Sequence, residues 1–213
     1  MVIMENFREL VREKISNRKI RIFDFPNFKK SAVILLFYVR DNVPFIIFEK
    51  RQKHLKNHSG EVSLPGGEIE PGKDKNLLDT VFRETFEEIG IDKSQIKIIG
   101  RIDDMFTLTS HYIVSTYIGE INNFDINKVT INKDEVAEVF EVPINVFLDE
   151  TNFSEKFWTI KNRKIPIQYY TYKNYIIWGA TGYIINKFIQ IVFDFNPSSM
   201  KNFDRMDPDL VIK

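Results

Sequence analysis

The segment RETFEEIGI, residues 83–91, constrains this chain more than any other part of its sequence. In a helix, which turns by about 100° per residue, Glu84, Glu87 and Glu88 share one face. The opposite face is predicted to be buried and carries Leu78, Val81, Phe82, Thr85 and Ile89. Three carboxylates within one turn repel one another and destabilise an isolated helix. Such a cluster is either a solvated acidic face or a set of oxygen ligands for a divalent cation such as Mg²⁺.

A glycine turn directly before this helix favours the cation. The Pro-Gly-Gly segment at residues 65–67 cannot continue a strand or a helix, and its bare backbone can approach a metal ion or a phosphate closely. We expect Asp74 to cap a helix over residues 75–90, with Gly90 as its C-terminal stop. The predicted strand–loop–helix unit therefore places a phosphate-binding loop beside candidate metal ligands.

Residues 67–91 resemble a Nudix box, the loop–helix motif of hydrolases that cleave nucleoside diphosphates linked to another moiety. The second half of the box matches at Arg83, Glu84, Glu87, Glu88, Gly90 and Ile91. The first half departs from the family pattern, because the loop before Arg83 is two residues longer and the expected glutamate falls on Lys73 or Lys75. Either Asp74 or Glu70 takes that role, or the position is vacant.

The resemblance implies an α/β protein, a Nudix α/β/α sandwich with a mixed central sheet, and an enzyme that hydrolyses pyrophosphate bonds. In this family the residues matching Glu84 and Glu88 are the principal ligands of Mg²⁺ or Mn²⁺, and Arg83 orients them by ion pairing. We expect Glu87 and the carbonyl of Gly67 to complete the metal site.

The expected reaction is attack of water on one phosphorus atom, with the other phosphate as the leaving group. Protein groups and metal ions mainly position the reactants, neutralise the developing charge and acidify the water. The family's general base is less fixed in sequence. Glu135 is our candidate for the base or an additional ligand, with Glu138 second. The alternative is that both are simply exposed acids.

The segment before the box, residues 47–67, resembles an additional signature of the coenzyme A pyrophosphatase branch of Nudix enzymes. Gly60 and the Pro-Gly-Gly turn occur at the expected intervals, whereas Lys56, Leu64 and Glu49 replace the usual arginine, phenylalanine and threonine. This resemblance extends over most of residues 31–193. It implies hydrolysis of coenzyme A or its derivatives to 3′-phosphoadenosine 5′-phosphate and (acyl-)4′-phosphopantetheine.

The same segment is basic, which suits a substrate with several phosphates. We expect substrate binding by the side chains of Arg51, Lys53, Lys56 and His58 and by the backbone of Gly60 and Gly66. The alternative is a solvated basic loop. His54 and His58 are poor candidates for a zinc site, because no cysteine and no third histidine is near.

Two other functions remain open at this point. The altered first half of the box is compatible with a Nudix hydrolase of ADP-ribose, a dinucleotide or a nucleoside triphosphate. A third hypothesis is a Nudix-fold binding module without turnover. The intact Glu84, Glu87 and Glu88 argue against it, because a pure binder has little need of a self-repelling cluster.

Composition bounds the remaining properties. We expect an amphipathic helix and lead-in over residues 1–30, a Nudix domain over 31–195 and a tail over 196–213. Thirty basic and thirty acidic residues balance, so no global field favours a nucleic-acid partner. Without a run of about 18 apolar residues or a signal-peptide pattern, we expect a cytoplasmic protein without membrane contact. The sequence leaves open whether the chain is a monomer or a homodimer.

The expected elements follow from apolar periodicity and turn residues. Strands are predicted at 32–39, 45–48, 96–105, 112–121 and 136–142, with a turn at Asp41-Asn42. A short helix at 143–148, a hairpin of 157–160 with 165–172 and a buried helix at 178–193 complete the order. Asp103 and Asp104 are interpreted either as acids behind the metal site or as turn caps, and Phe106 as a core residue or a cover over the ligand.

Overall fold

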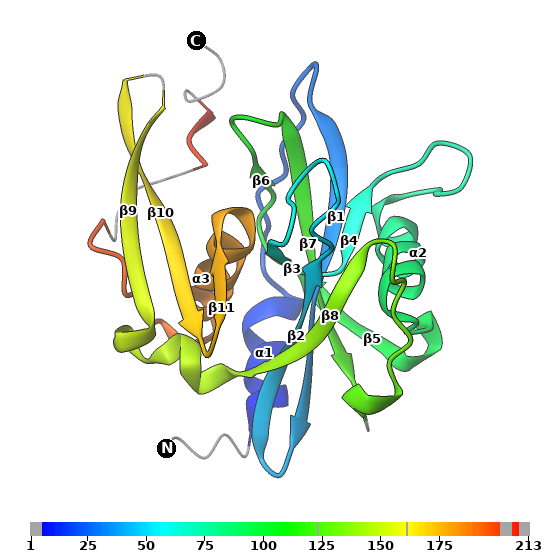
Figure 1. Ribbon diagram of the computed structural model, residues 1–213. Coiled ribbons are helices and arrows are strands. Elements are labelled where there is room, and N and C mark those ends of the chain that lie inside the picture. The colour runs from blue at the N-terminus through cyan, green and yellow to red at the C-terminus, as the bar shows by residue number, and fades with distance from the viewer. Residues whose placement is uncertain (1–5, 123, 161, 201–205, 209–213) are drawn as a thin grey trace.

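The computed structural model describes residues 6–122, 124–160, 162–200 and 206–208. Eight strands within these residues form a mixed central sheet (Figure 1). They are β1 (Lys29–Arg40), β2 (Val43–Arg51), β3 (Val62–Ser63), β4 (Gly66–Glu68), β5 (Ile96–Arg101), β6 (Met105–Phe106), β7 (Tyr112–Ile121) and β8 (Val136–Pro143). Strand β1 runs parallel to β7 and antiparallel to β2 and β4. The predicted mixed sheet is therefore confirmed.

Strand β1 lies at the centre of the molecule, and its alternating side chains enter two different cores. Leu35 and Phe37 pack on one face of the sheet, and Ile34 and Leu36 pack on the other. A strand covered on both faces has no polar side, which explains the continuous apolar run in its sequence. At its end, Asp41 and Asn42 have φ of 51° and 60°, as a two-residue hairpin requires.

Helices cover both faces of this sheet, as the α/β/α prediction requires. Helix α2 (Leu77–Ile89) packs Val81 and Ile89 against the Ile34 side of β1. Helices α1 (Phe7–Ser16) and α3 (Gly179–Phe193) lie on the opposite side of the sheet from α2 (Figure 1). The amphipathic N-terminal helix therefore packs on the domain, with Phe7, Val11 and Ile15 fully buried. Residues 1–5 of the predicted N-terminal segment lie outside the described residues.

The chain continues from β8 into a second, smaller sheet beside α3. The 3₁₀ segments Ile144–Leu148 and Glu150–Asn152 lead into antiparallel strands β9 (Phe153–Ile160), β10 (Arg163–Tyr172) and β11 (Tyr175–Trp178). Further 3₁₀ turns lie at Lys93–Gln95 and Ile126–Lys128. The predicted hairpin is confirmed, with β11 as an added third strand. No helix among the described residues is long and apolar enough to cross a membrane.

One predicted strand is too long, because residues 102–104 leave the sheet ladder. The two oxygens of Asp103 accept hydrogen bonds from the Arg18 guanidinium at 2.7 and 2.8 Å. The buried Asp104 accepts from Arg101 at 2.6 Å and from Ser115 at 2.8 Å. Both acids therefore fasten the N-terminal lead-in and β5 to the core, which overturns both interpretations offered for them. Phe106 is fully buried, so the core interpretation is confirmed.

Candidate active site

The glycine turn lies between the central strand and the acidic helix. Residues of β4 pair with β1, with Gly66 opposite Val33 and Gly67 opposite Ala32. A Cβ on Gly66, whose φ is 145°, would lie 2.6 Å from the Cα of Val33. A Cβ on Gly67 would lie 2.6 Å from the carboxyl carbon of Glu84. A side chain at Gly66 would therefore collide with the backbone of β1, whereas one at Gly67 would displace the Glu84 carboxylate.

Helix α2 begins two residues later than expected. Its N-cap is Asn76, whose side-chain oxygen accepts hydrogen bonds from the N–H groups of Leu78 and Asp79. The predicted cap at Asp74 is therefore wrong, because that side chain is engaged elsewhere. The predicted end is confirmed, since Gly90 closes the helix in the left-handed conformation with φ of 68°.

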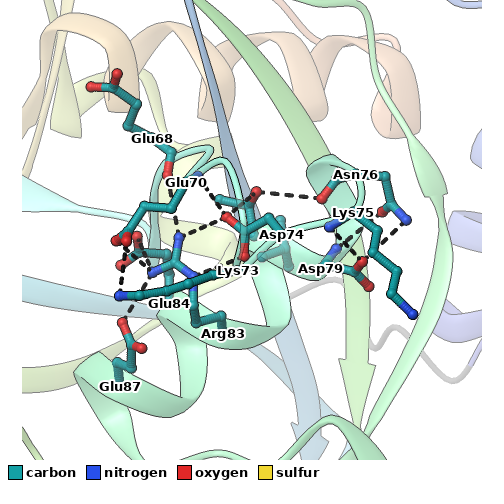
Figure 2. Close-up of polar contacts among 12 residues, drawn as sticks. Glu68, Glu70, Lys73, Asp74, Lys75, Asn76, Asp79, Arg83, Glu84 and Glu87 are labelled. Atoms are coloured by element: carbon teal, nitrogen blue, oxygen red, sulfur yellow. Dashed lines mark hydrogen bonds and ion pairs between the residues drawn. The ribbon is translucent and has the colours of Figure 1, made fainter.

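Asp74 instead receives the guanidinium of Arg83 (Figure 2). Arg83 donates from Nε to Oδ1 at 2.8 Å and from Nη2 to Oδ2 at 2.9 Å. Asp74 also accepts from the Glu70 N–H at 2.8 Å and from the Thr80 hydroxyl at 3.0 Å, and its side chain is only 1% exposed. These hydrogen bonds, above all those from Arg83, hold the pKa of Asp74 well below its usual range. Asp74 is therefore the buried loop acid that binds Arg83, while Glu70 stays half-exposed, pairs with Lys73 and lies 3.4 Å from the same guanidinium.

Arg83 links this loop to the acids of the helix. Its Nη1 lies 2.8 Å from Glu84 Oε1 and 3.0 Å from Glu87 Oε2, and its Nη2 donates to the Glu68 carbonyl at 3.3 Å. Glu87 is 47% exposed, whereas the side chain of Glu84 is 14% exposed. Arg83 therefore pairs with Glu84 and Glu87, whereas Glu88 is contacted by Gly66 and Arg51 instead.

Glu88 does not lie on a solvated face, because the glycine turn covers it. Its side chain is 2% exposed, and its Oε2 accepts the N–H of Gly66 at 2.9 Å. Arg51, from the end of β2, places Nη1 3.9 Å from Glu88 Oε1. Burial raises the pKa of Glu88 well above its ordinary value, and the negative charge of Glu49 raises it further. One of the three predicted carboxylates is thus held inside the protein.

Glu49 is a fourth carboxylate of this site, which the sequence analysis did not place there. It lies on β2 and is 1% exposed. The Ser63 hydroxyl on neighbouring β3 donates to its Oε1 at 2.9 Å. Burial raises the pKa of Glu49 to about 7, and the charges of Glu135 and Glu84 act in the same direction. Strand periodicity was the available signal, since Glu49 shares a face of β2 with Ile47, which packs against α2.

The two candidates for the general base lie on opposite sides of the sheet. Glu135 is half-buried just before β8, and its negative charge raises the pKa of both Glu49 and Glu84. Glu138 is exposed, lies opposite Lys50 and accepts a hydrogen bond from the Tyr175 hydroxyl at 2.6 Å. The structure therefore brings Glu135, and not Glu138, to the carboxylate cluster.

The predicted substrate-binding residues divide into two groups. Arg51 and Gly66 contact the carboxylate cluster through Glu88. Lys53, Lys56 and His58 lie exposed in the connection between β2 and β3, where His58 Nδ1 is 2.9 Å from Glu61 Oε2. Gly60 turns this connection with φ of 68°. The role of these loop residues stays a prediction.

The cluster of Glu49, Glu84, Glu88 and Glu135 carries the donor set that a hard divalent cation prefers. Glu84, like Glu49 and Glu88, has a raised pKa, chiefly because of burial. A buried set of like charges is costly until a cation offsets it. Among the described residues no three acidic or histidine side chains are yet grouped around one ion position. In this arrangement Arg83 pairs with Glu84 and Glu87, and the Gly66 N–H donates to Glu88.

A pH dependence of stability follows for the metal-free protein. The folded-state pKa of Glu49 is raised from 4.5 to about 7, so its protonated form is favoured by folding. This contribution is fully present below pH 4.5 and is lost as the pH rises through 7. In EDTA we expect the melting temperature to rise as the pH falls from 7 toward 4.5, before Asp74, with its lowered pKa, opposes it at lower pH. Calorimetric scans across this range test it, and a melting temperature that falls throughout would contradict it.

Comparison with known proteins places the site in a family context. The profile of the NUDIX domain matches residues 28–160. Nudix hydrolase 15, mitochondrial, of Arabidopsis thaliana is 33% identical over 178 residues, which are 80% of this chain and 61% of that protein. The NudL protein of Yersinia pestis (strain Pestoides F) is 30% identical over 77% of this chain and 80% of its own length. A MutT/nudix family protein from Enterococcus faecalis shares the fold with a TM-score of 0.53, at 14% identity over 84% of this chain and 69% of that one.

Proposed function

The chain belongs to the Nudix family of hydrolases, which act on the pyrophosphate bonds of nucleoside diphosphate derivatives, and we propose that its substrate is coenzyme A or a coenzyme A derivative. The products are then 3′-phosphoadenosine 5′-phosphate and (acyl-)4′-phosphopantetheine. The observation that carries the hydrolase assignment is the buried carboxylate cluster beneath the Gly66–Gly67 turn. The coenzyme A assignment rests on the signature in residues 47–67 and on the position of its basic residues.

The position of the basic loop supports a substrate with more than one phosphate group. The loop connects Arg51, at the end of β2, with β3, and both strands border the cluster through Glu49 and Ser63. A diphosphate bound at the cluster therefore lies next to a loop that carries Lys53, Lys56 and His58. Coenzyme A has a further 3′-phosphate on its ribose, which these exposed cations suit.

The residues of the site have separate tasks in this reaction. Mg²⁺ or Mn²⁺, when bound, supplies neutralisation of the phosphate charge and acidification of water. Glu84, Glu87, Glu88 and the Gly67 carbonyl would hold the ion, and the ion pairs of Arg83 would fix the positions of Glu84 and Glu87. Glu135 accepts the proton of the attacking water, the new P–O bond forms, and the bridging oxygen departs with the other phosphate.

A mass-spectrometric product assay tests the proposal. The protein is incubated with Mg²⁺ or Mn²⁺ and with coenzyme A, acetyl-coenzyme A, ADP-ribose, NADH and dinucleoside polyphosphates. We expect 3′-phosphoadenosine 5′-phosphate from coenzyme A, and its loss in a Glu84→Gln variant. Glu13→Gln is a matched control, because Glu13 is exposed on α1, on the other face of the sheet. If only another compound of the panel is hydrolysed, the proposal of coenzyme A as the substrate is wrong, while the assignment as a Nudix hydrolase stands.

A cytoplasmic location stays a prediction. Two relatives from Arabidopsis thaliana carry the words mitochondrial and chloroplastic in their names. Localisation of the tagged protein in its own cells is the direct measurement.

A further inference from the structure

Glu49 occupies a position where a carboxylate has no structural advantage. Its side chain is directed from β2 into the interior between the sheet and α2, and only 1% of the residue is exposed. Its cross-strand neighbour Ser63 satisfies Oε1 with a hydrogen bond of 2.9 Å. A neutral side chain would lie in this place at a smaller desolvation cost.

The second oxygen of Glu49 is buried and has no hydrogen-bond partner among the described residues. A buried polar atom without a partner costs about 1–3 kcal/mol, and more when it is charged. Such atoms are rare in folded proteins and point to an ion, a water molecule or a ligand that completes them.

The charges around Glu49 identify the ligand as a cation. Glu84, Glu88 and Glu135 all interact with it electrostatically and are acidic. Among the described residues, Arg51 supplies the positive charge that acts on Glu49. Its Nη1 also lies 3.9 Å from Glu88 Oε1. Arg83 pairs with Glu84 at 2.8 Å, so two guanidiniums face the four carboxylates, and a divalent cation would supply the remaining positive charge.

We propose that Glu49 binds a divalent cation directly through its free oxygen, as a ligand in addition to the carboxylates of α2. This deepens the proposed function, because it uses the same cation site. Oxygen-only donors select Mg²⁺ or Mn²⁺ over softer metals. Ser63 acts as a positioning residue, because its hydroxyl binds Oε1 and leaves Oε2 without a partner among the described residues.

Metal affinity and stability, measured without any substrate, test this assignment. Mn²⁺ binding is followed by the electron paramagnetic resonance signal of the free ion, and melting temperatures are recorded with EDTA and with saturating Mn²⁺. In Glu49→Gln we expect Mn²⁺ affinity to fall by about tenfold or more, while the melting temperature in EDTA stays the same or rises. The amide still accepts from Ser63, so the fold keeps its hydrogen bond. Glu13→Gln should match the wild type in both measurements.

A structural role for Glu49 predicts the opposite pattern. The assignment is overturned if Glu49→Gln binds Mn²⁺ like the wild type, or if the wild type binds none. Should Glu49→Gln not fold, Ser63→Ala takes its place, since it keeps the charge and removes only the positioning bond. We expect a smaller loss of Mn²⁺ affinity there, and unchanged affinity overturns the proposal. If Glu49→Gln loses Mn²⁺ affinity but the wild type leaves coenzyme A intact, the substrate proposal fails and Glu49 remains a metal ligand. If the wild type cleaves coenzyme A but Glu49→Gln keeps its Mn²⁺ affinity, the ligand proposal fails and the substrate proposal stands.

Discussion

A Glu88→Gln variant is expected to lose hydrolysis by a factor on the order of 10³, which is the loss typical when one group that stabilises transition-state charge is removed. Glu88 Oε2 accepts the Gly66 N–H at 2.9 Å, and the amide oxygen of glutamine can accept the same bond. The substitution therefore removes a charge and little of the shape. Steady-state turnover of the substrate found by the product assay gives the measurement.

The same substitution should not destabilise the metal-free protein. The Glu88 side chain is 2% exposed and its pKa is raised, so its ionised form opposes folding. Replacing a poorly compensated buried charge by a neutral group of equal size is often neutral or stabilising by about 1–2 kcal/mol. We expect denaturant unfolding in EDTA to show this, and we expect Mg²⁺ to stabilise this variant less than it stabilises the wild type. Turnover within tenfold of the wild type would contradict the assignment of Glu88.

The buried carboxylates that the reaction needs destabilise the fold, and apolar packing around the site offsets this cost. The charged side chains converge where β2, β4 and α2 meet, and apolar packing lies on either side of this point. Val81 and Ile89 of α2 are fully buried against β1. This packing holds the helix in place although its acids repel one another, since tertiary burial outweighs surface pair energies of a few tenths of a kcal/mol.

The sequence predicted the parts of the site that lie on one element. Glu84, Glu87, Glu88 and Arg83 belong to a single helix, so spacing alone placed them together, and Gly90 marked its end. The hairpin turn at Asp41-Asn42 was equally local, because both residues tolerate positive φ.

Features that depend on pairing between elements were not predictable in the same way. Glu49 meets Ser63 only because β2 pairs with β3 in this register. Glu88 is buried because the β4 turn folds over it, whereas helix periodicity indicated only that it shares a face with Glu84 and Glu87. Asp103 found its partner Arg18, which is 85 residues away in sequence. Such contacts require knowledge of the tertiary arrangement, which propensity and period do not contain.

The longer loop of the box is the clearest example, and it leads to the second large effect. Counting from either end placed a lysine at the glutamate position, yet the loop folds so that Asp74 meets Arg83. The two additional residues are accommodated in a turn where the N–H groups of Lys73 and Asp74 bond the Glu70 carbonyl. Asp74, whose side chain is shorter than that of a glutamate, thus reaches Arg83 from a loop that is longer than the family pattern.

Asp74→Asn is expected to destabilise the protein by about 3 kcal/mol, because removing the charge of one partner from a buried ion pair is strongly destabilising. Asp74 accepts two bonds from Arg83 and is 1% exposed, so solvent does not replace what is lost. The matched control is Glu70→Gln, which changes a half-exposed acid 3.4 Å from the same guanidinium and should alter stability by less than about 0.5 kcal/mol. Urea unfolding of both variants gives the comparison.

Replacing Asp74 should also affect the carboxylates of α2. This effect distinguishes an orienting role of Asp74 from a purely structural one. Without Asp74, the guanidinium of Arg83 is left with Glu84 and Glu87 as its acidic partners on α2, and it then competes with a cation for them. We therefore expect Mn²⁺ affinity to fall in Asp74→Asn at temperatures where the variant is fully folded. Equal loss of stability in both variants would mean that Asp74 does not replace the box glutamate. Wild-type Mn²⁺ affinity in a destabilised Asp74→Asn would limit its role to holding the loop on α2.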